Sequence, residues 1–176
     1  MRPLQAEQAA FYLQLKLPEV KSEHRLTRAV IEAIPTGNAD YRPDPNSKTA
    51  VELAWHIAAT EHRFTVGVAK GAFDFNAIPR PEGGLTPVTI SNWYEKAFLE
   101  DFETLTKMTP EACAREMDFR GIVQMSAVLF LDFMIKHSVH HRGQLSAYLR
   151  ASGGKVPSIY GESYDSAEAK KAAGQS

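Results

Sequence analysis

The amino-acid sequence predicts an all-α protein folded as a four-helix bundle. Three observations support this prediction: four segments of similar length carry apolar residues at helical spacing, proline- and glycine-rich stretches separate them, and strand signals are poor. The 176 residues suffice for one domain with a sizeable hydrophobic core. We expect residues 1–165 to form this single domain and residues 166–176, which are small and charged, to be a disordered tail.

The first helix is expected over residues 18–34, because Pro18 suits the first turn of a helix and Pro35 cannot continue one. A short amphipathic segment, residues 5–15, is expected to form a separate turn or two before it. Residues 35–46 combine proline, glycine, asparagine and aspartate, a composition that is typical of a loop.

The second helix is expected to run as far as Lys70 and to end at Gly71. Either Ser47 or Thr49 can cap its N-terminus. In the second case Thr49 and Glu52 have the spacing of a capping box, in which each side chain accepts a hydrogen bond from the backbone of the other.

An exposed connection is expected at residues 78–87, which hold three prolines and two glycines. The third helix is expected over residues 89–108, before the next proline. The fourth helix is expected over residues 124–151, and residues 152–154 supply a left-handed glycine after its end. Residues 119–123 could pair briefly as a strand, but the pattern is too weak for us to predict one there.

Composition and charge argue against several classes of function. The formal net charge is −1, from 20 basic and 21 acidic residues, so no field of one sign attracts nucleic acid or an anionic membrane. Cys113 is the only cysteine, which excludes an intrachain disulfide. Residues 1–7 lack the apolar core of a signal peptide, and the longest apolar stretch, residues 126–135, is about half as long as a membrane span. We therefore expect a soluble cytoplasmic protein without a nucleic-acid or membrane partner.

Three of the histidines fall on the apolar faces of predicted helices. His56 lies beside the stripe of the second helix and is expected to point inward. The stripe consists of Leu53, Ile57, Thr60, Phe64 and Val68. In the fourth helix two histidines stand in the stripe itself, where leucine would pack better. That stripe consists of Phe130, Met134, His137, His141, Leu145 and Tyr148.

This placement of the histidines is typical of a metal site. His137 and His141 are four residues apart, so they share one helical face and their ring nitrogens can converge on one ion. His56, from a facing helix, would complete a three-nitrogen face that leaves positions open for water or substrate. Neutral imidazole suits zinc, nickel, iron or copper. The spacing leaves two alternatives open: hydrogen-bonded core histidines without a metal, and His140 in place of His141.

Other sites are less well supported by the pattern. His24 and His62 are expected to face the surface or loops, and His62 lies about 240° around the helix from His56. The sequence contains no HExxH, no P-loop, no GxGxxG after a strand and no GxSxG elbow. Cys113 is expected to be chemically passive.

Two stretches resemble the signatures of the DinB/YfiT-like superfamily. Residues 53–57 (LAWHI), followed by Glu61 and Phe64, resemble its second-helix signature. Residues 137–145 (HSVHHRGQL) resemble its fourth-helix signature, a histidine followed after three residues by His-Arg-Gly-Gln. The loop at residues 41–43 is also similar to members of this group, and the resemblance covers nearly the whole chain.

The resemblance implies a four-helix bundle with a long crossover connection, and a homodimer. It also implies a divalent metal ion on His56, His137 and His141. His141 is favoured over His140 because it directly precedes Arg-Gly-Gln, as in the signature. Zinc or nickel is the favoured ion, with iron or manganese as alternatives.

Characterised members of this group include transferases and isomerases that use low-molecular-weight thiols such as bacillithiol, mycothiol or glutathione. The resemblance therefore implies a metal-dependent enzyme with a small-molecule substrate, in which the metal activates such a thiol. Two alternatives stay open: a metal-dependent hydrolase, and a non-enzymatic metal-binding stress-response protein.

The neighbours of the histidines carry further expectations. Gly143 inside a helix costs about 1 kcal/mol relative to alanine, which predicts that another backbone approaches closely there. Arg142 and Gln144 are expected to hydrogen-bond loops rather than to act in catalysis. Each imidazole is expected to donate its other N–H to a carboxylate or a carbonyl. The candidate carboxylates are Glu52, Glu61 and Asp132.

Overall fold

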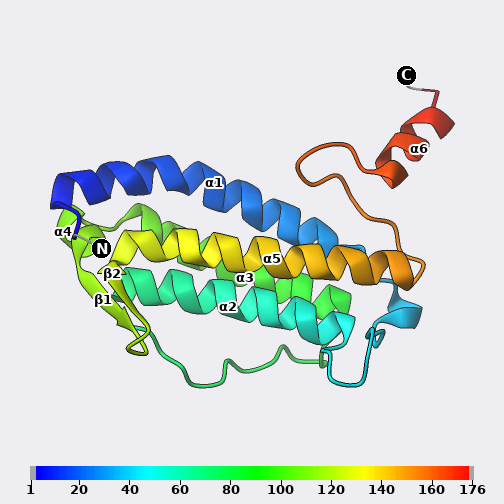
Figure 1. Cartoon of the computed structure of the whole chain (residues 1–176), viewed down its shortest axis with the longest axis horizontal. Coiled ribbons are helices and arrows are strands. Elements are labelled where there is room, and N and C mark those ends of the chain that lie inside the picture. Colours follow the sequence, from blue (N-terminus) through cyan, green and yellow to red (C-terminus); the bar gives the residue numbers. More distant parts are fainter. Residues whose placement is uncertain (1–2, 175–176) are drawn as a thin grey trace.

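The structure, a computed structural model, describes residues 3–174 and contains a bundle of four long helices (Figure 1). These helices are α1 (Ala6–Glu32), α2 (Ala50–Lys70), α3 (Pro87–Thr106) and α5 (Phe130–Ala151). Helix α2 packs against α3 and α5, and α1 packs against the same two helices, so α1 and α2 are diagonal neighbours. The predicted all-α four-helix bundle is confirmed.

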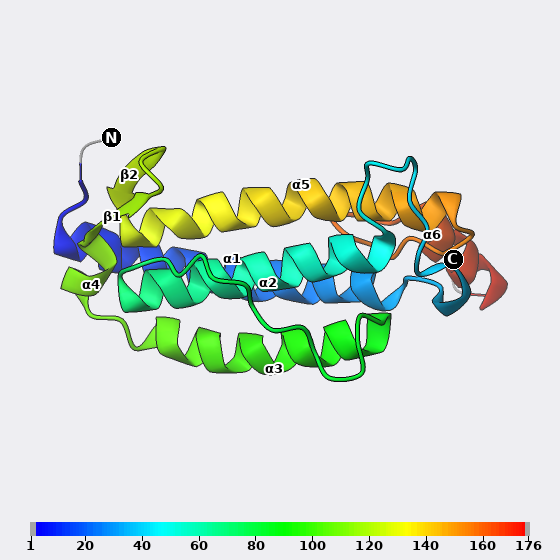
Figure 2. The same cartoon turned by 90° about the horizontal axis from the view of Figure 1, so that it is seen from below.

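The chain path includes the expected long crossover. Residues 71–86 run back along the bundle from the end of α2 to the start of α3, so these two helices point in the same direction (Figure 2). The connection from α1 to α2 contains a short 3-10 helix, η1 (Thr36–Asn38). The crossover lies over the outer face of α2, and residues of both line a cleft.

Helix α1 is continuous, so the prediction of a separate lead-in and a helix that begins at Pro18 is wrong. Pro18 lies in mid-helix on the exposed side, where it removes one backbone hydrogen bond. Leu13 and Val20, on either side of it, are both buried in the core. Tertiary packing therefore holds the two halves in line, which local propensity alone does not predict.

Helix α2 begins and ends as predicted. Thr49 is its N-cap: the Glu52 N–H donates to Thr49 Oγ1 at 3.3 Å, and the Thr49 N–H donates to Glu52 Oε2 at 2.9 Å. Gly71 follows the last turn with a left-handed backbone, φ 79°, a conformation that glycine adopts without steric strain.

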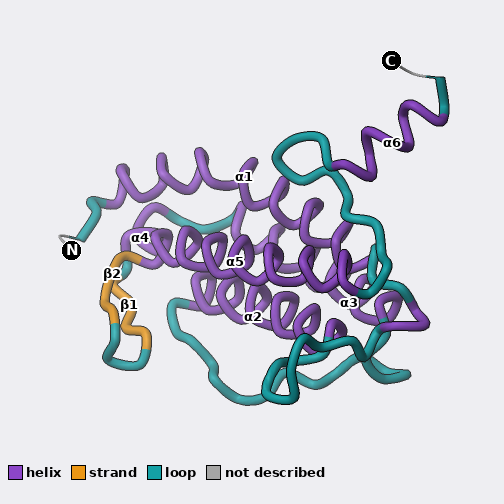
Figure 3. The backbone as a smooth tube through the Cα atoms, turned by 45° about the vertical axis from the view of Figure 1, so that its right-hand side comes forward, coloured by secondary structure: helices purple, strands orange, loops and turns teal. Residues whose placement is uncertain are grey.

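The connection from α3 to α5 holds more structure than predicted (Figure 3). It contains a short helix, α4 (Pro110–Ala114), and an antiparallel hairpin of β1 (Glu116–Phe119) and β2 (Val123–Ser126). Another 3-10 turn, η2 (Ala127–Leu129), then leads into α5. The expected start of the last helix at residue 124 is therefore wrong, because residues 124–126 are paired in the hairpin.

The hairpin depends on two residues with left-handed backbone at its turn. Arg120 and Gly121 have φ angles of 56° and 69°, and the Ile122 N–H donates to the Phe119 carbonyl at 3.0 Å. Phe119 then pairs with Val123 in register. We predicted no strand over residues 119–123. In the structure residue 119 ends β1, residue 123 begins β2, and residues 120–122 form the turn between them.

The end of α5 is confirmed, since Gly153 has φ 79° and the Gly154 N–H donates to the Leu149 carbonyl at 2.8 Å. The chain then continues to α6 (Tyr164–Ala172), which lies beyond the end of the bundle (Figures 1 and 3). Residues 166–172 of the expected disordered tail are therefore helical. Residues 175–176 lie outside the described part of the chain.

The hydrophobic core consists of two clusters along the bundle. One gathers the N-terminal part of α1, the ends of α2 and α3, α4, β1, η2 and the start of α5. The other gathers the C-terminal part of α1, the first half of α2, the start of α3 and the end of α5. Within residues 3–174, none of the helices is long and apolar enough to cross a membrane.

Candidate metal centre

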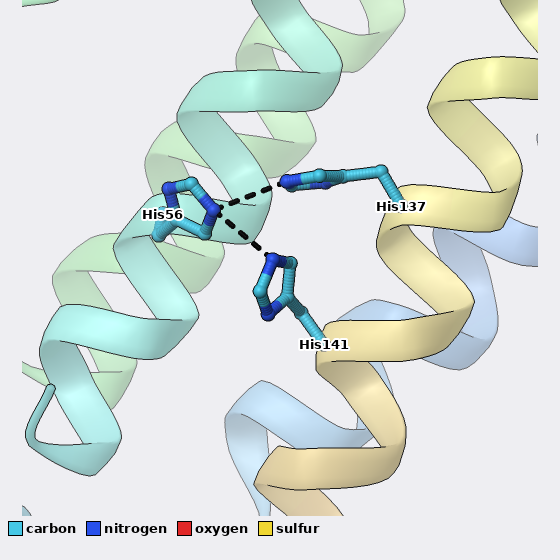
Figure 4. Close-up of side chains that lie close together, drawn as sticks. All are labelled: His56, His137 and His141. Carbon is cyan, nitrogen blue, oxygen red and sulfur yellow. Dashed lines mark hydrogen bonds between the residues drawn. The ribbon is translucent and has the colours of Figure 1, made fainter. Parts of the chain in front are cut away.

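Three histidine rings from two adjacent helices converge between α2 and α5 (Figure 4). His56 Nε2 lies 3.1 Å from His137 Nε2 and 3.3 Å from His141 Nε2. One nitrogen of each ring lies within 4.8 Å of the other two. All three side chains are half-buried, whereas His140 is exposed and is not part of the group.

The spacing of the three nitrogens fits one divalent ion. Two nitrogens bound to a tetrahedral ion at about 2.0–2.1 Å lie about 3.3–3.4 Å apart. The two contacts of His56, at 3.1 and 3.3 Å, are close to that separation. Three imidazole nitrogens are also a donor set that zinc, nickel and iron accept. The group can therefore hold a metal ion.

The protonation of the rings also suits a metal. Burial, followed by the charges of the nearby His141, Lys48 and Arg63, lowers the pKa of His56 to about 4. Burial, followed by the other histidines, lowers the pKa of His137 to about 4. Both rings are therefore neutral at neutral pH, and a neutral imidazole offers the lone pair that a metal requires.

Gln144 orients one of the three rings. His141 Nδ1 lies 2.7 Å from Gln144 Oε1, and since this oxygen only accepts, the ring proton is assigned to Nδ1. The lone pair of His141 then lies on Nε2, which faces His56. The expectation that Gln144 hydrogen-bonds a loop is wrong, because its side chain accepts a hydrogen bond from His141, three residues before it.

The candidate carboxylates do not contact the rings. Glu52 caps α2, Glu61 accepts a hydrogen bond from the hydroxyl of Tyr94, and Asp132 accepts one from the hydroxyl of Tyr12. Their expected role beside the imidazoles is therefore wrong. Among residues 3–174, the buried His137 Nδ1 has no hydrogen-bond partner.

Two further histidines lie away from the centre. His24 is only 4% exposed, so the expectation that it faces the surface is wrong. Its ring stacks on Phe98 with centroids 3.7 Å apart, and its Nε2 lies 2.9 Å from Glu95 Oε2. His62 Nδ1 lies 2.6 Å from Asp101 Oδ2 on α3, on a different side of α2 from His56.

The two residues that follow His141 are Arg142, which is buried, and Gly143, which is exposed. Arg142 is 1% exposed and donates to Glu23 Oε2 at 2.6 Å and to Thr27 Oγ1 at 3.1 Å, both on α1. It also donates to the hydroxyl of Tyr160 in the segment after α5. At Gly143 no atom lies within 4 Å of an added Cβ, so the predicted close approach of another backbone is wrong.

A cleft of about 410 Å³ adjoins the histidines between α2 and the crossover connection. His56 lines it, so one residue belongs both to the cleft and to the group of three rings. The volume is in the range of small-molecule sites. This cleft was not predicted, because four of its eleven lining residues come from the crossover, a loop whose path the sequence does not predict.

The model of the DinB family matches residues 13–173 of the chain. Two Bacillus subtilis proteins, both described as uncharacterized, are similar in sequence. YjoA is 27% identical over 135 residues, which cover 75% of this chain and 85% of YjoA. YrdA is 30% identical over 117 residues, which cover 64% of this chain and 66% of YrdA.

Two crystal structures are similar in fold. The DinB-like protein YjoA from Bacillus subtilis has a TM-score of 0.67 at 23% identity and covers 84% of this chain and 98% of its own. A DinB-like protein from Bacillus cereus ATCC 10987 has a TM-score of 0.67 at 25% identity and covers 82% of this chain and 95% of its own. These likenesses support the bundle architecture described above.

Proposed function

Because this chain belongs to the DinB family, we propose that it binds one divalent metal ion on His56, His137 and His141 and catalyses a thiol-dependent transfer. The observation that carries the proposal is the convergence of three ring nitrogens beside a cleft of small-molecule size. Zinc or nickel is the ion that we favour, with iron or manganese as alternatives.

A divalent ion held on three imidazoles supplies Lewis acidity that lowers the pKa of a low-molecular-weight thiol and favours its thiolate. The protein's own residues prepare the site for that chemistry. Gln144 keeps the His141 lone pair on Nε2. Burial keeps His56 and His137 neutral, and the cleft offers space for the electrophile next to His56.

The proposal is tested by the rate at which a thiol is consumed. Metal-loaded protein is mixed with a thiol such as glutathione and the electrophile 1-chloro-2,4-dinitrobenzene, and the product is followed by absorbance. We expect acceleration by the wild type, its loss in His137→Ala, and its retention in His140→Ala. His140 is the matched control because it lies on the same helix, is exposed, and stands outside the group.

The outcomes separate this function from its alternatives. Equal rates for the wild type and His137→Ala would refute metal-dependent thiol transfer. Metal-dependent turnover of esters or amides without thiol consumption would identify the protein as a hydrolase instead. A stoichiometric ion without turnover of any substrate would indicate a non-enzymatic metal-binding protein. We also propose that the chain acts in the cytoplasm as a homodimer. Light scattering of the purified protein tests the dimer.

A further inference from the structure

The cleft beside His56 is surrounded by positive charge. Lys48 precedes α2, Arg63 lies on α2, and Arg80 lies on the crossover connection; all three line the cleft. The one carboxylate in its lining is Glu52. Three cations and one carboxylate give this small volume a formal charge of +2, whereas the whole chain has −1.

These cations are not neutralised by ion pairs within the protein. Among residues 3–174, no salt bridge involves Lys48, Arg63 or Arg80. Arg28, by contrast, pairs with Glu95 at 2.8 Å. Glu52 accepts a hydrogen bond from the N–H of Thr49 at the helix N-cap, and its single charge balances only one of the three cations. The positive charge of the cleft is therefore available to a ligand.

One of the cations also holds the cleft open in a fixed shape. Arg63 Nε donates to the Asp74 carbonyl at 2.9 Å, and its Nη2 donates to the Asn76 carbonyl at 2.8 Å. These bonds attach the crossover to α2 and are made to neutral groups, so the guanidinium retains its full charge. Lys48 and Arg80 are exposed at the rim and are free to close on a ligand.

The remaining walls suit a small organic molecule. Trp55, Ile78 and Leu85 supply apolar surface, and the indole of Trp55 is fixed by a T-shaped contact with Trp93 at 4.7 Å between ring centroids. Apolar walls with a few convergent polar groups are typical of sites that orient a small ligand. Three cations are too few for a nucleic-acid backbone, which needs an extended basic surface.

We propose that this cleft is a subsite that binds the oxyanion group, a carboxylate or a phosphate, of a small-molecule ligand through Lys48, Arg63 and Arg80. The identification of that ligand as the substrate rests on the proposed function, because His56 joins the cleft to the three rings. Arginine and lysine bind both anions by charge-assisted hydrogen bonds. An anionic group held there would place the rest of the molecule next to His56.

The test is a titration of the full-length chain after removal of metal with a chelator, so that no anion can bind an ion instead. Succinate, inorganic phosphate and the neutral analogue succinamide are added separately to nitrogen-15-labelled protein. The readout is the NMR signal of the Trp55 indole N–H, assigned with a Trp93→Phe variant. We expect saturable shifts with succinate, phosphate or both, and none with succinamide. The tighter anion identifies the group as carboxylate or phosphate.

Two double variants make the test specific. Lys48→Gln/Arg80→Gln removes two cleft cations that make no ion pair, and is expected to weaken binding by roughly 10- to 100-fold. Lys21→Gln/Arg25→Gln removes the same charge from exposed positions on α1, and should leave binding unchanged. No saturation with either anion, equal affinity for succinamide, or equal effects of the two double variants would overturn the proposal.

Metal content separates this inference from the proposed function. Anion binding in a chain that takes up no stoichiometric metal would support the subsite and refute the metal-dependent function. Stoichiometric metal without saturable anion binding would refute the subsite alone. Because Lys48→Gln/Arg80→Gln does not touch the three rings, it is expected to retain the metal content of the wild type.

Discussion

The buried Arg142 is expected to be among the most sensitive positions for stability. Its guanidinium joins α5 to α1 by bonds to the Glu23 carboxylate, the Glu23 carbonyl and Thr27, and it reaches the hydroxyl of Tyr160. Removal of one partner from a buried ion pair costs about 3–5 kcal/mol, because the other charge is left uncompensated. We therefore expect Arg142→Met, which keeps much of the volume, to lower the free energy of unfolding by about 3–5 kcal/mol.

The assay is urea unfolding followed by circular dichroism, together with thermal melting. For a chain of this size 1 kcal/mol corresponds to roughly 2–4 °C, so the melting temperature should fall by about 6–20 °C. Arg150→Met on the same helix is the matched control. Its partner is Asp165 at 2.7 Å and its side chain is 51% exposed, so the expected cost is about 0–1 kcal/mol.

The double variant Glu23→Gln/Arg142→Met distinguishes an ion pair from simple packing. Removal of both charges leaves no uncompensated group, so the double variant should lose less stability than the sum of the two single variants. A loss below about 1 kcal/mol for Arg142→Met, or strict additivity in the double variant, would refute the assignment of this pair as a buried ion pair that stabilises the contact of α1 with α5.

Three further predictions concern residues near the centre. Gly143→Ala should raise the free energy of unfolding by about 0.5–1 kcal/mol, since the added Cβ meets no atom, and a destabilised protein in urea unfolding would contradict this. Burial raises the pKa of Glu61 above its ordinary 4.5, so the folded state keeps a proton that the unfolded chain releases. Stability should therefore fall as pH rises from about 4.5 through the raised pKa, and Glu61→Gln should abolish this fall; parallel pH profiles of the two proteins in urea unfolding would contradict it. Gln144→Ala should weaken metal binding by about 10–100-fold in competition with a chelating dye, whereas Gln144→Glu, which keeps an acceptor, should retain it. Equal affinities for Gln144→Ala and the wild type would contradict that role.

The four helices were predictable because their signals are local. Thr49, Glu52 and Gly71 fix both ends of α2 by hydrogen bonds within a few residues of each other. The predicted helix start at Pro18 was wrong because the local preference of proline is overruled by the burial of Leu13 and Val20 in the core. The hairpin was missed because its strands have four residues each and no strong alternation.

The three histidines were identifiable because the helical period places them on inward faces, and the resemblance selected His141 over His140. Their convergence depends on the packing of α2 against α5, which no single stretch of sequence encodes. The hydrogen bond from His141 to Gln144 joins residues at i, i+3 spacing, so the helical pattern could have predicted it. The cationic cleft was not predictable in this way, because Arg63 and Arg80 come to line the same cleft only through the course of the crossover.

Elemental analysis of tag-free protein tests the central claim most directly, because all of the proposed chemistry needs one ion on three rings. After dialysis against excess zinc or nickel and then against buffer, the wild type and His140→Ala should each retain one ion per chain. His56→Ala, His137→Ala and His141→Ala should each retain far less. Undiminished metal in those three variants, or none in the wild type, would contradict the account.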